Sequence, residues 1–170
     1  MHSKKIRKLT LTSVLAALTC VATMLIRIPT PTKGYVNLGD CMVNISAWLL
    51  GPLCGGAAAG FGSAAADLLS GYVVYAPATL IIKALMAALS FMIFSLSDKK
   101  LHSLSARIIA AISAEILMVL GYFAFEAVIY GSVVTASAGI IGNVCQGIMG
   151  TVSSVILYEA VIRRIPAKNI

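Results

Sequence analysis

A continuous apolar stretch near the N-terminus decides the class of fold: residues 9–28 read LTLTSVLAALTCVATMLIRI. These 20 residues would rise about 30 Å as an α-helix, which matches the hydrocarbon core of a bilayer. Helix-breaking residues follow, because Pro29 and Pro31 open a loop-like segment that runs to Asp40. The stretch therefore predicts a first transmembrane helix.

The composition extends this interpretation to the whole chain. Of the 170 residues, 59% are hydrophobic and 11% are charged, and the mean hydropathy is +0.96. A soluble domain of this size cannot bury so much apolar surface, whereas lipid can solvate it. Continuous apolar runs rich in Ala, Leu and Ile favour helices over a β-barrel. We expect one all-α domain over residues 1–170, a multi-pass protein of the cell membrane.

Six apolar runs predict a bundle of six transmembrane helices. The second run ends at Leu50, because Gly51-Pro52 stops it. The others cover approximately residues 55–72, 77–96, 108–130 and 136–162. A charged link at 97–107 separates the fourth run from the fifth.

Basic residues predict the orientation of these helices. With six spans, one side receives ten of the thirteen Lys and Arg residues: Lys4, Lys5, Arg7, Lys8, Lys99, Lys100, Arg107, Arg163, Arg164 and Lys168. The other side has only Arg27 and Lys33, near the first loop. Cytoplasmic loops are enriched in Lys and Arg, so both termini are expected in the cytoplasm. The net charge of +7 is thus a topology signal, and no interleaving of basic and aromatic residues indicates nucleic-acid binding.

Ionisable side chains within the expected helices are candidates for a binding site, because charges in lipid are costly and usually face a cavity or a partner. Asp67 lies near the outer end of the third helix, and Lys83 lies about two turns into the fourth. Their depths are similar. Either the two form an ion pair that pins two helices, or Lys83 points into a ligand cavity.

The fifth helix has a polar stripe. By the helical repeat, Tyr122, Glu126 and Tyr130 share one face with Glu115. Glu126 is near the outer end and is the better ligand candidate. Glu115 is near the inner end, where pairing with basic residues at the cytoplasmic surface is an equal alternative.

Amide side chains mark the sixth helix and the first loop. Asn143 and Gln146 lie in the outer half of the sixth helix, where lipid cannot satisfy their donors and acceptors. Small residues on that helix favour close packing, namely Gly139, Gly147, Gly150 and Ser154. In the loop, Asn37 supplies an amide and Asp40 a carboxylate. The prediction is one outward-facing cavity lined by Asn37, Asp40, Asp67, Lys83, Tyr122, Glu126, Asn143 and Gln146.

The first helix presents small residues, with Ser13 and Ala17 one turn apart and Ala16 beside them. Small residues let helices approach closely in lipid. This surface either packs within the bundle or docks another membrane protein.

No catalytic constellation or cofactor motif is present. The four cysteines lack metal-like spacing and are expected to be buried apolar residues. A chain of this length without repeats, if it transports uphill, must take its energy from a partner.

Four motifs together resemble a known family of membrane subunits. They are GYVNLGD at 34–40, Gly51-Pro52 with GFGSAAAD at 60–67, IKALM at 82–86, and residues 143–147. They resemble the substrate-binding subunits (S components) of energy-coupling factor (ECF) transporters. The resemblance covers nearly the whole chain, and the riboflavin-type branch matches best. That branch is similar to subunits for pyridoxine and hydroxymethylpyrimidine.

The resemblance implies six helices with a vitamin site near the outer surface, roofed by the first, third and fifth loops. It also implies a transmembrane coupling subunit and two cytoplasmic ATPases as partners, so the chain itself is not expected to be an enzyme. Docking through the first helix is implied for Ser13, Ala16 and Ala17. The family's usual Ala-xxx-Ala reads Ser13-xxx-Ala17 here, and Ser is still small.

Two other functions remain open from the residues alone. One is a structural or assembly membrane protein without a ligand, in which buried charges only pair helices. The other is a small membrane enzyme, which the missing catalytic cluster disfavours. Among vitamins, one Trp and few expected cavity aromatics favour a small pyridine or pyrimidine over a large flat ring.

Overall fold

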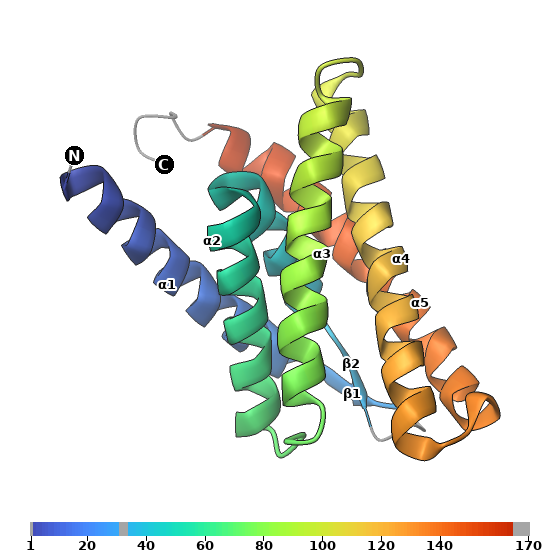
Figure 1. Ribbon diagram of the computed structural model, residues 1–170. Helices are drawn as coiled ribbons and strands as arrows, with labels where there is room; N and C mark the ends of the chain where they lie inside the picture. The colour runs from blue at the N-terminus through green and yellow to red at the C-terminus, as the bar shows by residue number, and fades with distance from the viewer. Residues whose placement is uncertain (1, 31–33, 165–170) are drawn as a thin grey trace.

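The computed structural model describes residues 2–30 and 34–164. Its elements in chain order are α1 (His2–Leu25), β1 (Arg27–Pro29), β2 (Tyr35–Asn37), α2 (Gly39–Leu69), α3 (Ala76–Ser97), α4 (Ser103–Tyr130), α5 (Val133–Ala160) and a 3-10 turn (Ile162–Arg164). The long helices run roughly along one axis, and α1 leans away from the others at its N-terminal end (Figure 1). The prediction of a helical bundle is confirmed.

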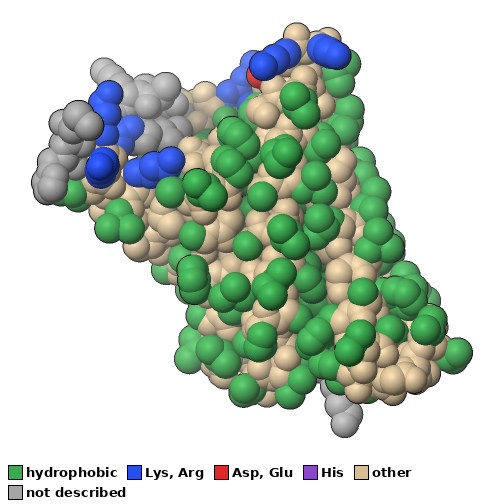
Figure 2. Space-filling view, in the orientation of Figure 1, with side chains coloured by type: hydrophobic (Ala, Val, Ile, Leu, Met, Phe, Trp, Pro, Cys, Tyr) green, Lys and Arg blue, Asp and Glu red, His purple; other side chains and the backbone are tan. Residues whose placement is uncertain are grey.

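Within the described residues, five helical segments are long and apolar enough to cross a membrane. They are Lys4–Leu25, Gly39–Leu69, Ala76–Ser97, Ser103–Tyr130 and Val133–Arg164. Hydrophobic side chains cover the visible face along the length of the molecule (Figure 2). Such a surface is suited to lipid, because large apolar patches are rare on soluble monomers.

The count of six separate helices is not confirmed, because the expected second and third helices fall in one element, α2. That element is broken at Gly51, whose φ of 80° and ψ of −176° are not helical. Gly55 packs against the backbone of Ser46, although residues nine apart in a straight helix are about 13 Å apart. The chain therefore turns back at Gly51. The first arm, 39–50, would rise only about 18 Å, which is too short to cross a bilayer alone.

Local capping explains why helices begin earlier than the apolar pattern predicted. The side chain of Ser132 accepts a hydrogen bond from the backbone N–H of Thr135 at 3.2 Å, so α5 starts at Val133. The ring of His102 accepts from the N–H of Leu104 at 3.3 Å and caps α4. Polar capping residues lie outside the hydrophobic run they cap, so hydropathy places such starts too late.

The segment between α1 and α2, predicted as a loop, contains a short β-hairpin. Strands β1 and β2 are antiparallel, with Ile28 opposite Val36 and Arg27 opposite Asn37. Val36 and Asn37 are buried, and β2 contacts α5. The hairpin therefore folds into the bundle and carries Asn37 towards the last helix.

Basic side chains gather at one end of the molecule. The start of α1, the turn between α3 and α4, and the end of α5 all lie at this end (Figure 1). In Figure 2 the visible Lys and Arg side chains lie at the same end. Lys33 and Lys168 lie outside the described residues. The clustering agrees with the expected grouping of basic residues, and the cytoplasmic position of this end stays a prediction.

Candidate ligand-binding site

A cavity lies between the β-hairpin and the bundle, at the end opposite the basic residues. It is lined by Thr30, Gly34, Tyr35, Asn37, Asp67, Tyr75, Thr79, Tyr122, Glu126, Asn143 and Gln146. Its empty space is about 380 Å³ when the open mouth is counted, but the centre of a water-sized sphere fits in only about 30 Å³. The lining side chains must therefore move apart to admit a ring-sized ligand.

One wall of the cavity pairs a tyrosine with a carboxylate. The Tyr35 hydroxyl donates to Asp67 Oδ1 at 2.6 Å, and the Tyr35 ring packs on Tyr72 with centroids 4.5 Å apart. Burial, followed by the hydrogen bond to Asp67, raises the pKa of Tyr35 well above its usual value, which keeps the hydroxyl protonated as a donor. The carboxyl group of Asp67 is buried and also interacts with the side chain of Thr79.

The opposite wall holds a second carboxylate among hydroxyl groups. Tyr75 donates to Glu126 Oε1 at 3.2 Å, and its hydroxyl lies 3.4 Å from that of Tyr130. The hydroxyls of Thr79 and Tyr122 are 3.0 Å apart. Burial, with the hydrogen bond to Tyr130 and the charge of Glu126, raises the pKa of Tyr75. The walls are therefore rich in acceptors and in neutral hydroxyls.

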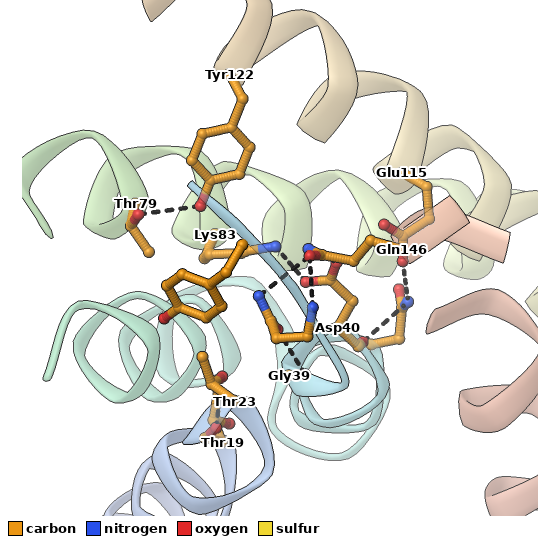
Figure 3. A network of polar contacts seen from close by, with 12 residues as sticks. Thr19, Thr23, Gly39, Asp40, Thr79, Lys83, Glu115, Tyr122 and Gln146 are labelled. Atoms are coloured by element: carbon orange, nitrogen blue, oxygen red, sulfur yellow. Dashed lines mark hydrogen bonds and ion pairs between the residues drawn. The ribbon is translucent and has the colours of Figure 1, made fainter. Parts of the chain in front are cut away.

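A chain of hydrogen bonds forms the floor (Figure 3). Both nitrogens of Asn37, backbone N and Nδ2, donate to Gln146 Oε1 at 2.9 and 3.1 Å. Gln146 Nε2 in turn donates to Asp40 Oδ2 at 2.6 Å. The other oxygen of Asp40 pairs with Lys83 Nζ. The floor thus connects the hairpin to α5, α2 and α3.

The structure brings six of the eight expected site residues to the cavity wall. They are Asn37, Asp67, Tyr122, Glu126, Asn143 and Gln146. Asp40 and Lys83 are not in the wall but lie buried as an ion pair at the far end of the floor network, at 0% and 2% exposed.

The ion pair of Lys83 with Asp67, one of the two alternatives from the sequence, is not formed, because each residue has another partner. Lys83 contacts Asp40, and Asp67 contacts Tyr35. Asp40 opens the first arm of α2, and the reversal at Gly51 lets both arms of that helix pack in the same bundle. The arm that carries Asp40, rather than the arm that carries Asp67, meets the ammonium group of Lys83.

Glu115 is also buried away from the basic surface. It is 5% exposed and accepts a hydrogen bond from Asn44 Nδ2 at 3.3 Å. The alternative that it pairs with cytoplasmic basic residues is therefore wrong. The packing predicted for α5 is present here, because a Cβ added to Gly147 would lie 3.0 Å from the Glu115 Cβ, and one added to Gly150 would lie 2.7 Å from its Oε1.

Sequence reasoning missed two tyrosines in the wall, Tyr35 and Tyr75. With Tyr122 they give the cavity three aromatic rings, so the expectation of few cavity aromatics is wrong. Both missed residues lie outside the long helices, where no helical repeat predicts direction. The available signal was their position, since tyrosine is enriched at the ends of membrane spans.

The small residues of α1 do not share one environment. Ser13 and Ala17 are exposed, whereas Ala16 is half-buried. The backbone of Ala16 lies against Gly62 of α2. Ala16 therefore packs within the bundle, whereas Ser13 and Ala17 lie on the exposed face of α1.

The described residues show neither a metal site nor a disulfide bond. No group of three or more His, Cys, Asp or Glu side chains there is placed to hold a metal ion. All four cysteines are free; three are half-buried, and Cys145 is exposed, so the expectation of burial is wrong for Cys145.

Comparison with known proteins gives the following matches. The family model described as "ECF-type riboflavin transporter, S component" matches residues 3–163. An uncharacterised protein from the gap 3′ region of Pyrococcus woesei is 37% identical over 138 residues, which cover 81% of this chain and 86% of that protein. A solved structure described as the S component of a bacterial ECF transporter has a TM-score of 0.73 at 22% identity, covering 94% of this chain and 97% of that one. This last match shows a shared fold.

Proposed function

Because this chain belongs to the family of ECF-type riboflavin transporter S components, we propose that it captures a water-soluble vitamin or vitamin precursor for uptake. The observation that carries the proposal is a cavity with polar walls inside a bundle whose exterior is apolar. A polar cavity in lipid is costly unless it serves a polar ligand or a pathway. The family consists of transporter subunits rather than enzymes.

The charge distribution supports an outward-facing site. The basic end faces the cytoplasm by the positive-inside rule, so both termini lie inside and the cavity opens outside the cell membrane. Proteins that capture solutes from the medium need this orientation.

The cavity chemistry supports a ring-shaped vitamin of the riboflavin, pyridoxine or hydroxymethylpyrimidine class. Tyr35, Tyr75 and Tyr122 offer ring faces, while amides and carboxylates offer directed hydrogen bonds. Ligand sites commonly combine apolar or aromatic surface with a few polar groups that fix orientation.

Uphill uptake requires partners. The proposed partners are a transmembrane coupling subunit and two cytoplasmic ATPases, because the chain has no nucleotide-binding motif of its own. The proposed docking surface is the exposed face of α1 formed by Ser13 and Ala17, with Val14, Leu18 and Val21 around them.

A ligand should remain bound through purification. Mass spectrometry of small molecules released from the detergent-purified protein should identify a vitamin or precursor near one equivalent. The Asn143→Ala variant should lose about tenfold or more in affinity, since a lost buried hydrogen bond costs about 1–3 kcal/mol. A chain that releases no small molecule and binds no vitamin saturably would instead be a structural membrane protein.

The topology is tested by cysteine labelling in intact cells, on a background without the four native cysteines. A cysteine at Val73, exposed in the α2–α3 turn, should react with a membrane-impermeant maleimide. A cysteine at Lys99, in the basic α3–α4 turn, should react only after the cells are opened. Labelling of position 99 in intact cells would overturn the orientation.

A further inference from the structure

We propose that a groove between α1 and the first arm of α2 binds one anionic phospholipid. This α1–α2 groove is lined by Lys4, Arg7, Lys8, Leu11, Leu49 and Leu50. None of these residues lines the cavity under the β-hairpin, which lies at the other end of the molecule. The groove is therefore separate from vitamin capture and adds a second ligand to it.

The α1–α2 groove is open in the structure as it stands. Helix α1 leans away from the rest of the bundle at its N-terminal end (Figure 1), and Leu49 and Leu50 lie just before the reversal of α2 at Gly51. The volume of the groove is about 390 Å³, against about 30 Å³ for the cavity under the β-hairpin on the same measure. A ligand can therefore occupy the groove without first displacing its side chains.

The chemistry of the groove has two parts, an apolar base and a basic rim. The leucines are buried or half-buried, whereas Lys4 and Lys8 are exposed on one face of α1. No Asp or Glu is among the described residues that line the groove, and the ion pairs of the described residues involve neither lysine. Arg7 stands at the same rim but already interacts with another group. The two lysines are therefore the groups that the groove offers to an anion.

The position of the groove along α1 matches the headgroup level of a membrane. Both lysines precede the apolar run that begins at Leu9, and Leu11 lies about 4.5 Å further along the helix axis than Lys8. The rim therefore lies among headgroups and the leucines lie in the hydrocarbon layer. Four of the first eight residues are basic, and such clusters beside a transmembrane helix attract anionic lipids.

A phospholipid fits both parts of the groove at once. Its negatively charged headgroup would pair with the ammonium groups of Lys4 and Lys8, and an acyl chain would cover the leucines. A soluble anion would leave the apolar base uncovered. A neutral lipid would cover the base but leave the charge of the rim uncompensated.

The proposed docking face of α1 stays accessible when the groove is occupied. By the helical repeat, Ser13 and Ala17 lie on the side of α1 opposite to Lys4, Lys8 and Leu11. A lipid in the groove and a coupling subunit on the docking face can therefore bind at the same time.

The test identifies the lipids that the full-length protein retains. The protein is reconstituted in vesicles of phosphatidylglycerol and phosphatidylethanolamine in equal parts, with the same acyl chains, so that the two lipids differ in the headgroup. It is then released into a mild detergent and analysed by native mass spectrometry. The protein should retain a single phosphatidylglycerol, enriched about tenfold or more over phosphatidylethanolamine, because each lysine at a membrane surface adds to the attraction for anionic lipid.

Two variants and a matched control locate the site. Lys4→Gln with Lys8→Gln removes the charge of the rim from an exposed helix surface and should bring the enrichment down to that of the vesicle. Leu49→Trp keeps the charge but fills the base of the groove, and the monodisperse variant should also retain less lipid. Lys99→Gln with Lys100→Gln removes the same charge from the exposed α3–α4 turn and should leave the enrichment unchanged.

Each alternative occupant gives a different result. Equal retention of the two lipids by the native protein overturns the anionic site, and an equal loss in the Lys99 and Lys100 control overturns the groove as its location. Displacement of the lipid by an excess of glycerol 3-phosphate shows that a phosphate group alone is bound, which overturns a lipid ligand. If the native protein enriches no lipid and the Lys4 and Lys8 variant loses uptake, the rim is a contact for the coupling subunit instead.

Discussion

Replacing Lys83 with methionine should lower the free energy of unfolding by about 3–5 kcal/mol, the cost of leaving one partner of a buried ion pair alone. Asp40 is 0% exposed, so the variant would leave its carboxyl group buried without the ammonium group. Gln146 would still donate to it. The measurement is equilibrium unfolding in mixed micelles, followed by circular dichroism.

A surface ion pair provides the matched control. Arg163 pairs with Glu159 at 2.7 Å, but its side chain is 58% exposed. Arg163→Met should therefore change stability by less than about 1 kcal/mol. Equal losses in the Lys83 and Arg163 variants would contradict a special role for burial.

The double variant Lys83→Met with Asp40→Asn separates stability from binding. Removing both charges should recover much of the lost stability, because the uncompensated carboxylate is gone and Asn can still accept from Gln146. Neither residue lines the cavity, so the double variant should bind ligand nearly as tightly as the native protein. A folded double variant that does not bind would instead make the Asp40–Lys83 pair part of the binding site.

The helices could be predicted because lipid imposes a simple rule. A segment that crosses a bilayer needs about 20 apolar residues, and the runs ending near Ser97 and Tyr130 satisfy it without reference to the rest of the chain. The break in α2 could also be predicted, because Gly51-Pro52 lies where the chain turns back between the two helical arms.

The composition of the site could be predicted better than its contacts. Asn143 and Gln146 were recognisable because amides in apolar helices need partners. The partner of Lys83 was not, since the choice between Asp40 and Asp67 depends on how the two arms of α2 pack after the reversal at Gly51. Tyr35 lies in a β-hairpin that forms by pairing of two strands, and hydropathy does not predict such pairing.

Replacing Ala17 with tryptophan should strongly reduce uptake while leaving ligand binding intact. Ala17 and Ser13 are exposed on α1, and close approach of helices in lipid depends on small residues. A Trp side chain would hold a partner helix away from this face. A loss of only about 1.4 kcal/mol in subunit packing is one decade of affinity, so uptake should fall roughly tenfold or more. The measurement compares uptake of labelled vitamin with binding to the isolated subunit.

The choice of variant matters because neighbouring positions on α1 differ in what they contact. Ala16→Trp is unsuitable, since the backbone of Ala16 lies against Gly62 and a bulky residue there would disturb the bundle itself. Leu120→Trp is the matched control, because Leu120 is 60% exposed on α4 and the same ring would be added on a surface that faces lipid. It should leave uptake unchanged. If the Ala17→Trp subunit assembles with its partners and supports normal uptake, this face of α1 is a lipid surface and docking must use another helix.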